Sequence, residues 1–274
     1  MMFFTIVQRK LHEEMIVIKK SQIAAQLYTA RDHMKKASEV EETLKKVKAI
    51  GYQAVELPGL PPLEAGQWKE LLDRHGLACC AIHIGDGSLL ENPESAGRTL
   101  EQLGCSCAVL PFPRGVSFDS EESVKTMAQA LSSSGRMLRD KGYALLYHNH
   151  NIEFLRFRQS PWLEYIFQWT DRRSVQAELD VYWVQVGGGN PETWCRKLRG
   201  RLPILHLKDC GVDREREPVF KEIGQGNLEW KAILGEAKRS GCQWYVVEQD
   251  GNWINSDPFE ALGVSWDYLS RNFC

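Results

Sequence analysis

The chain has 274 residues, of which 43% are hydrophobic and 26% charged, and its formal net charge is −2. This length accommodates either one α/β barrel of about 250 residues or two small domains. The near-neutral charge and the lack of an arginine–lysine block argue against a nucleic-acid partner, so we expect a small-molecule ligand.

The cysteines and the apolar segments bear on the location of the protein. The eight cysteines contain no CxxC pair and no zinc-knuckle spacing, which favours reduced thiols. The apolar stretch 1–7 is too short for a signal sequence and lacks a cationic flank before it. No run approaches the roughly 18 apolar residues of a membrane span. We therefore expect a cytoplasmic protein with no membrane partner.

The first 20 residues differ from the pattern that follows, and we treat 1–20 as an N-terminal extension. Within it, Met15–Ile18 is compatible with an extra strand, an N-terminal plug or translation from an upstream start. The regular pattern opens with a strand-like run at 22–29. A predicted helix follows at 38–50, and its Ser-x-x-Glu start is a capping-box signal.

From residue 50 onward one pattern recurs: an amphipathic helix, a glycine and a short apolar run. Glycine adopts the left-handed conformation that closes a helix, so the chain can turn directly into a strand. Two further units, with strands at 175–179 and 202–207, keep the alternation of helix and strand but lack the glycine. The opening strand also lacks it. The glycines of the five complete copies are Gly51, Gly76, Gly104, Gly142 and Gly241.

About eight strands alternating with helices indicate a parallel sheet, because parallel strands need crossover helices. Eight is also the number of strands that closes a (β/α)8 barrel. No glycine-rich phosphate fingerprint follows the first strand, which disfavours a doubly wound sheet. We therefore predict an α/β fold, a (β/α)8 TIM barrel, as the single domain formed by 21–274.

Such a barrel carries its functional residues at the carboxyl ends of its strands. Four of the seven histidines are predicted to lie there, together with several acidic residues. In chain order these strand-end residues are Glu56, His83, Asp86, His148, His150, Glu178, Asp180, His206, Lys208, Asp209, Glu248 and Asp250. Because strand residues alternate between faces, His148 and His150 are expected to point the same way.

Each of these residues also has a structural interpretation. A lone histidine at a strand end is more often hydrogen-bonded than a ligand, and Asp209 or Asp250 is as compatible with a helix cap as with a site. The joint placement of a histidine, an aspartate, a histidine and a glutamate on predicted strands five to eight favours a site. Such nitrogen and oxygen donors suit Mn²⁺, Co²⁺, Fe²⁺, Zn²⁺ or Mg²⁺.

A set of segments in a fixed order makes the chain recognisable. These segments are Gln26–Asp32, Gly51–Glu56, Tyr147–Phe154, Leu179–Trp183 with Gly187–Pro191, Leu205–Asp209, Ile223–Trp230 and Val247–Asp250. In this order the chain resembles the sugar phosphate isomerase/epimerase superfamily of xylose isomerase-like TIM barrels, in its Tyr-His-Asn-His-x-x-Glu-Phe branch. That superfamily also includes inosose dehydratases, ketose 3-epimerases and endonuclease IV-type nucleases.

The resemblance implies a divalent metal ion, with Mn²⁺ the first choice and Co²⁺, Zn²⁺, Mg²⁺ or Fe²⁺ as alternatives. The epimerases carry a glutamate ligand on strand five where this chain has His148, and His150 is either a ligand or a substrate contact. In the family the metal ion holds a carbonyl and an adjacent hydroxyl while acidic side chains move a proton through an ene-diolate. The implied ligand set is His148, Asp180, His206 and Glu248.

The same resemblance implies catalytic and substrate-binding residues. The catalytic candidates are Glu248, Glu153, His150 and Lys208, and Lys208 is expected to stabilise developing negative charge. The expected substrate contacts are Glu56, His83, Trp183 and Asp250, although simple packing explains Trp183 equally well.

We therefore expect a metal-dependent isomerase or epimerase acting on a sugar, keto-sugar or cyclitol. An inosose dehydratase-type or keto-glycoside lyase on the same barrel is the second choice, and a catalytically inactive sugar-binding barrel is the third. The histidine on strand five removes one of the two bases of a symmetric ketose 3-epimerase. The ligands and basic face of an endonuclease IV-type nuclease are not evident, whereas a homodimer is compatible with the family.

Overall fold

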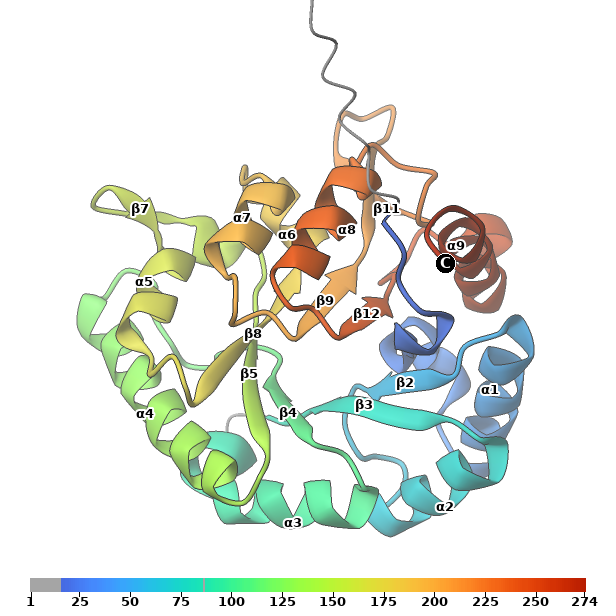
Figure 1. The fold of residues 1–274 in the computed structure, drawn as a ribbon, viewed down its shortest axis with the longest axis horizontal. Coiled ribbons are helices and arrows are strands. Elements are labelled where there is room, and N and C mark those ends of the chain that lie inside the picture. The colour runs from blue at the N-terminus through green and yellow to red at the C-terminus, as the bar shows by residue number, and fades with distance from the viewer. Residues whose placement is uncertain (1–15, 86) are drawn as a thin grey trace, which may run out of the picture.

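The computed structural model describes residues 16–85 and 87–274. Eight parallel strands close into a barrel in the order β1-β12-β9-β8-β5-β4-β3-β2 (Figure 1). These strands are β1 (Ile23–Gln26), β2 (Ala54–Leu57), β3 (Ala78–His83), β4 (Cys107–Leu110), β5 (Ala144–His148), β8 (Val175–Asp180), β9 (Ile204–Leu207) and β12 (Trp244–Val247). The predicted single-domain TIM barrel is thereby confirmed.

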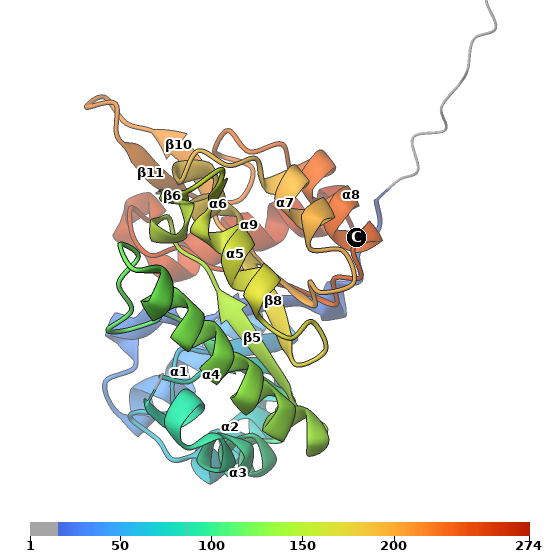
Figure 2. The same ribbon diagram turned by 90° about the vertical axis from the view of Figure 1, so that its left-hand side faces the viewer.

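Helices surround the barrel on its outside (Figures 1 and 2). They are α1 (Ala37–Ile50), α2 (Ala65–His75), α3 (Pro93–Leu103), α4 (Glu121–Asp140), α5 (Trp162–Trp169), α6 (Val181–Val186), α7 (Pro191–Lys197), α8 (Trp230–Arg239) and α9 (Pro258–Asn272). Shorter helical turns are η1 (Lys20–Gln22), η2 (Leu27–His33), η3 (Gly87–Glu91), η4 (Ile152–Phe154) and η5 (Ile254–Ser256). Among the described residues, no helix is long and apolar enough to cross a bilayer.

Two small antiparallel hairpins lie outside the barrel. One pairs β6 (Arg156–Phe157) with β7 (Ser160–Pro161), and the other pairs β10 (Asp209–Val212) with β11 (Pro218–Lys221). The second hairpin projects beyond the helices (Figure 2). Neither hairpin is predicted from the sequence, because both arise in connections that lack the helix–glycine–strand pattern.

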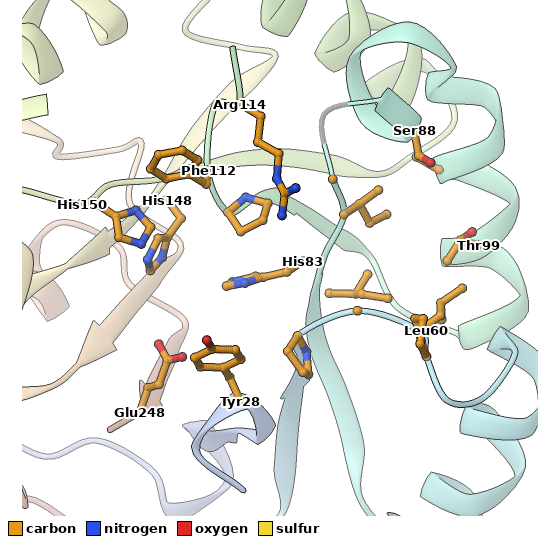
Figure 3. Close-up of a pocket in the computed structure, with 18 of the residues that line it drawn as sticks. Tyr28, Leu60, His83, Ser88, Thr99, Phe112, Arg114, His148, His150 and Glu248 are labelled. Carbon is orange, nitrogen blue, oxygen red and sulfur yellow. The ribbon is translucent and has the colours of Figure 1, made fainter. Parts of the chain in front are cut away.

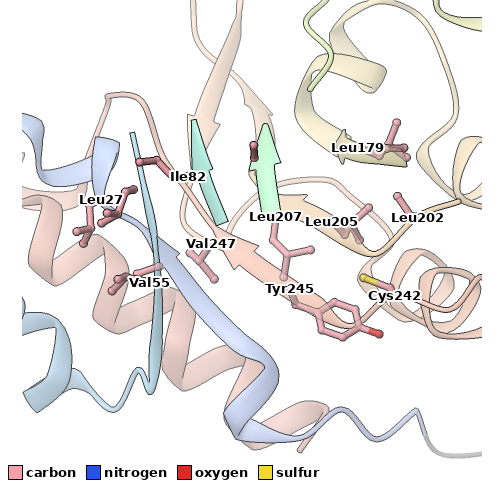
Figure 4. Packing of buried hydrophobic residues seen from close by; sticks show 14 of the residues in the cluster. Leu27, Val55, Ile82, Leu179, Leu202, Leu205, Leu207, Cys242, Tyr245 and Val247 are labelled. Carbon is pink, nitrogen blue, oxygen red and sulfur yellow. The ribbon is translucent and has the colours of Figure 1, made fainter. Parts of the chain in front are cut away.

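The main hydrophobic core lies between the strands and the helices. Outward-facing strand residues such as Val55, Leu205 and Tyr245 pack there (Figure 4). A smaller cluster fills the barrel interior, with Ala24, Ala54, Cys80, Ala81, Val109, Leu146, Ile204 and Val246. Because side chains alternate along a strand, the residue two positions after an interior apolar residue also faces inward. Those residues are polar for six strands, where they are Gln26, Glu56, His83, His148, His206 and Glu248.

Two glycines of the repeated pattern adopt the predicted left-handed conformation. Gly76 and Gly104 end α2 and α3 in the left-handed region, with φ of 60° and 69°. Gly51 has a φ of 128°, and a Cβ at this position would approach the Trp266 ring to within 2.6 Å. Glycine is therefore required at Gly51 for both its backbone conformation and its contact with α9.

Some boundaries differ from the predictions. The capping-box prediction is wrong: α1 begins at Ala37, and the side chain of its N-cap Lys36 makes no capping bond, whereas Glu39 accepts from the backbone N–H of Lys35 (2.9 Å). The strand-like run at 22–29 is a strand only in β1 and continues as η2.

The described part of the N-terminal extension contains no strand. Residues 16–19 have no regular structure, and Met15 lies outside the described residues. Ile18 is buried, and its backbone N–H donates to the carbonyl of Phe273 (2.7 Å). This segment is therefore attached to the end of α9.

Candidate active site

Three buried donor residues meet at the carboxyl ends of β8, β9 and β12. His206 Nδ1 is 3.0 Å from Glu248 Oε2 and 4.0 Å from Asp180 Oδ2. One donor atom from each residue lies within 4.8 Å of the other two. The inward-facing positions of neighbouring strands thus bring these side chains together, as predicted from the sequence.

His148, at the end of β5, lies beside this group and is oriented by a carboxylate. Its Nδ1 is 2.9 Å from Glu178 Oε2, and its Nε2 is 3.9 Å from Asp180 Oδ2. Burial and the neighbouring His206 lower the pKa of His148 well below its usual value. A neutral imidazole held through one nitrogen by a carboxylate presents the other nitrogen as a metal ligand.

His206 is oriented in the same way by a different carboxylate. Its Nε2 lies 2.6 Å from Glu56 Oε2, which leaves Nδ1 facing Asp180 and Glu248. Burial disfavours the imidazolium, but the negative charges of Glu178 and Glu56 outweigh it and raise the pKa of His206. In the metal-free protein His206 therefore contributes a positive charge, which a bound cation would displace as a proton.

Lys208 supplies a second positive charge at the same place. Its Nζ lies 2.9 Å from Glu248 Oε2, 3.0 Å from Asp250 Oδ2 and 3.1 Å from Asp180 Oδ2. Burial lowers the pKa of an ammonium, but the three carboxylates outweigh this effect and raise the pKa of Lys208. The charge of Lys208 is therefore balanced by the carboxylates around it.

Asp250 lines the cavity, and only one of its two carboxylate oxygens has a hydrogen-bond partner among the described residues. Oδ2 accepts from Lys208, whereas Oδ1 is buried and has no hydrogen-bond partner among the described residues. Burial, reinforced by the charge of Glu248, raises the pKa of Asp250 to about 6. A carboxylate with a pKa in this range is a suitable proton acceptor at neutral pH.

His150 lies next to His148 but faces a different environment. Its ring is 5.5 Å from the rings of Phe112 and Trp183, and its Nδ1 has no hydrogen-bond partner within the described chain. Burial and the positive charge of Lys208 lower its pKa to about 4. His150 is therefore a neutral imidazole at the cavity wall.

Glu153 is the one catalytic candidate that the structure does not bring to the cavity. It is fully buried and accepts from the Tyr147 hydroxyl (2.7 Å) and from the backbone N–H of His150 (2.8 Å). Burial raises its pKa to about 7. This geometry makes Glu153 a positioning residue for the segment that carries the two histidines.

The expected substrate contacts divide into two groups. His83 and Asp250 line the cavity, whereas Glu56 and Trp183 do not. Glu56 lies behind the histidines, and Trp183 packs against His150 and Tyr182. The packing interpretation of Trp183 thus agrees with the structure.

His83 lines the cavity and also contacts the buried carboxylates of Glu56 and Glu178. Its Nε2 is 3.0 Å from Glu178 Oε2 and 3.4 Å from Glu56 Oε1, and its ring stacks on that of His206. Burial opposes its protonation, but the charges of Glu56 and Glu178 outweigh this and raise its pKa to about 10. His83 is therefore a cationic group facing the cavity.

The donor set fits a divalent cation. Asp180 Oδ2 is buried and accepts no hydrogen bond from the described residues, although the Lys208 ammonium is 3.1 Å away. His148 and His206 each have a carboxylate behind the nitrogen opposite the site, which is the usual outer-shell arrangement of metal-binding histidines. These nitrogen and oxygen donors are those expected for Mn²⁺, Co²⁺, Fe²⁺ or Zn²⁺.

A cavity of about 800 Å³ opens in front of this group (Figure 3). Its inner end is formed by His83, His148, His150, Lys208, Glu248 and Asp250. From there it extends across the mouth of the barrel to the loops that follow β2, β3 and β4. The reactive groups therefore occupy only one end of the cavity.

The sequence profile of the xylose isomerase-like TIM barrel family matches residues 44–263. The chain belongs to this family. The resemblance inferred from the ordered segments is thereby confirmed.

Individual relatives are distant. The chain is 22% identical over 273 residues to an inosose dehydratase of Clostridium beijerinckii, and the match covers 86% of this chain and 90% of that protein. Its structure is similar to that of a sugar phosphate isomerase/epimerase from Parabacteroides distasonis, with a TM-score of 0.78, 22% identity and coverage of 92% and 94%. An L-ribulose 3-epimerase aligns with a TM-score of 0.72, 16% identity and the same coverage. These structural similarities establish the fold.

Several roles were not apparent from the sequence. Glu178 is recognisable as an inward-facing residue because it lies two positions before Asp180, but its contacts with three imidazoles require the barrel geometry. Asp209 is neither a helix cap nor a site residue. Its carboxylate accepts from the backbone N–H groups of Gly224, Gly226 and Leu228 and from the Trp230 indole, and so holds that loop. Asp86 lies outside the described residues.

Proposed function

We propose that the protein is a divalent-metal-dependent enzyme that removes a proton from the carbon next to a carbonyl in a sugar, keto-sugar or cyclitol. The observation that carries this proposal is the convergence of Asp180, His206 and Glu248 beside a cavity that Asp250 and Lys208 also line. The relatives named inosose dehydratase and L-ribulose 3-epimerase support this substrate class.

Asp180, His206 and Glu248 would hold the ion, with His148 as the fourth ligand. The Nε2 position of His148, 3.9 Å from Asp180 Oδ2, favours it over His150. Mn²⁺ is our first choice, and Co²⁺, Fe²⁺, Zn²⁺ and Mg²⁺ suit the same donors. When bound, such an ion supplies Lewis-acid polarisation of the substrate carbonyl.

We assign proton removal to Asp250 rather than to Glu248. Glu248 Oε2 is already bonded to Lys208 and lies 3.0 Å from His206 Nδ1, and both contacts favour its charged, weakly basic form. Asp250 Oδ1 accepts no hydrogen bond from the described part of the chain, and the pKa of Asp250, about 6, is close to neutral pH. Lys208 donates to the substrate oxygen that becomes negative, and neutral His150 contacts a substrate hydroxyl.

Dehydration is the second candidate reaction, and His83 favours it specifically. Elimination of water requires an acid that protonates the departing hydroxyl. His83 faces the cavity as an imidazolium, with a pKa of about 10. A symmetric 3-epimerisation is less favoured, since His148 replaces the second carboxylate base that the resemblance implies for that reaction.

Solvent deuterium exchange tests the proposed reaction. We expect the Mn²⁺-loaded protein to incorporate deuterium next to the carbonyl of at least one member of a panel containing D-fructose, D-allulose, 3-keto-D-glucose and scyllo-inosose. NMR spectroscopy measures the exchange, and loss of water would be seen in the same spectra.

Two variants separate the base from the ligand. Asp250→Asn should slow exchange about 100-fold or more while Mn²⁺ binding persists, because only the proton acceptor is removed. Glu248→Gln should lose both. Asp140→Asn, at an exposed aspartate at the end of α4, is the control. No exchange with any compound, or full exchange by Asp250→Asn, would contradict the proposal.

A further inference from the structure

The cavity is much larger than the reactive end requires. A volume of about 800 Å³ is typical of pockets for drug-sized ligands and is several times that of one hexose. If the carbonyl of a sugar lies beside Asp250 and Lys208, as the proposed function requires, a single sugar ring fills only the inner end. The remaining space continues toward Leu60 and Thr99 on the far side (Figure 3).

The walls of that remaining space are largely apolar. Where this space meets the reactive end it is bordered by Tyr28, beside Glu248, and by Phe112, beside His150, two large hydrophobic side chains that are 42% and 46% exposed (Figure 3). Leu60, Pro61, Ile84 and Pro111 extend the same surface. Exposed apolar surface gathered in a concave site indicates that a ligand covers it.

One cation in this apolar part has no ion-pair partner within residues 16–85 and 87–274. The Arg114 side chain extends from the loop after β4 toward the middle of the cavity (Figure 3). No carboxylate of the described residues forms an ion pair with it, whereas the Lys208 ammonium has three such partners. A guanidinium fork that is free at a ligand cavity suits a carboxylate or phosphate, which it binds through two parallel hydrogen bonds.

We infer that the substrate is a conjugated sugar, in which the reacting ring carries an aryl or similarly flat apolar group that bears an anion. The apolar group packs on Phe112 and Tyr28, and the anion binds Arg114. This inference rests on the proposed function for the position of the sugar, but the anion subsite itself does not depend on catalysis.

Binding of simple glucosides tests the subsite without turnover. Isothermal titration calorimetry on the full chain compares D-glucose, phenyl β-D-glucoside, 4-carboxyphenyl β-D-glucoside and 4-phosphonophenyl β-D-glucoside. We expect both aryl anions to bind about tenfold or more tightly than phenyl glucoside. The two anionic probes distinguish a carboxylate from a phosphate-type group as the preferred ligand.

Variants then assign the preference to residues. Arg114→Ala should abolish the preference for the anionic probes and leave phenyl glucoside binding unchanged. Arg114→Lys should retain part of it, since the charge persists without the fork. Phe112→Ala should weaken every aryl probe several-fold but leave glucose unaffected. Arg98→Ala, at an exposed arginine of α3 outside the cavity, is the matched control.

An anion preference that survives in Arg114→Ala, or aryl glucosides that bind no better than glucose, would overturn this inference. If either outcome is found but simple keto-sugars still exchange deuterium, only the conjugated substrate is refuted, and the proposed reaction stands. An Arg114-dependent preference without any exchange supports the subsite and refutes only the proposed reaction.

Discussion

The two halves of the barrel mouth differ in their chemistry. The half formed mainly by β5, β8, β9 and β12 carries buried imidazoles, carboxylates and an ammonium, which contact one another and also Glu56 of β2 and His83 of β3. The half formed by the loops after β2, β3 and β4 is apolar and exposed, and its Arg114 has no ion-pair partner within the described residues.

This difference suggests a division of labour between reaction and recognition. Groups that must hold an ion or move a proton need fixed positions and shifted pKa values, so they lie at strand ends inside the barrel. Groups that recognise the rest of a substrate need only a complementary surface, and loops provide it. The charged half should therefore dominate the stability of the protein, and the apolar half its ligand preference.

The largest stability effect is expected from removing the ammonium of the charged half. Lys208→Met leaves Asp180, Glu248 and Asp250 without their common counter-ion. We expect the free energy of unfolding in EDTA to fall by about 3–5 kcal/mol, the usual result of breaking a buried ion pair. Urea denaturation measures this change.

Added Mn²⁺ should recover more stability in Lys208→Met than in the unmodified protein, because a bound cation replaces the missing charge. Lys238→Met, at an exposed lysine of α8, is the control. Equal stability of Lys208→Met and the unmodified protein in EDTA would show that the carboxylates do not depend on this ammonium.

A smaller, pH-dependent effect is expected at Glu153. Its pKa is raised from 4.5 to about 7, so the folded state binds more protons than the unfolded state between these pH values. The resulting stabilisation is complete below about pH 4.5 and is lost as the pH rises through 7, with an upper bound of about 3 kcal/mol. Glu153→Gln should remove this dependence.

Unfolding titrations between pH 4.5 and 8 measure the slope for Glu153→Gln and for the unmodified chain. Glu122→Gln, at an exposed glutamate of α4, should leave the slope unchanged. If Glu153→Gln has the same slope as the unmodified protein, another group is responsible for it.

The smallest stability effect is expected in the apolar half. Phe112 is 46% exposed, and Arg114 forms no ion pair with the described residues. Alanine at either position should change the free energy of unfolding by no more than about 0.5 kcal/mol, as is usual for surface positions. A loss of several kcal/mol in thermal or urea unfolding would show that these side chains support the fold. It would contradict the proposed difference between the charged and the apolar half.

The same contrast explains which features the sequence predicts. Asp180, His206 and Glu248 follow apolar runs, so strand periodicity alone places them on one face at one end of the barrel. The glycine at the end of each repeated helix marks where the next strand begins. The barrel and the core of the candidate site can therefore be derived from local patterns.

The positions of the other residues depend on how the loops between strands and helices fold. Arg114 and Phe112 belong to a loop with no motif, and only the closed barrel brings them in front of His150. Asp209 is compatible with a helix cap in the sequence, but the loop that it holds returns from residues 224–230. Such contacts join distant segments, and short-range periodicity carries no information about them.

The central claim is that Asp180, His206 and Glu248 bind a divalent ion, and a Mn²⁺ titration tests it most directly. We predict that the full chain binds about one Mn²⁺ per molecule and that Asp180→Asn weakens this binding about 100-fold or more, while Asp140→Asn does not. Calorimetry or electron paramagnetic resonance gives both the stoichiometry and the affinity. Failure of the unmodified protein to bind Mn²⁺, Co²⁺ or Zn²⁺, or undiminished binding by Asp180→Asn, would contradict the account.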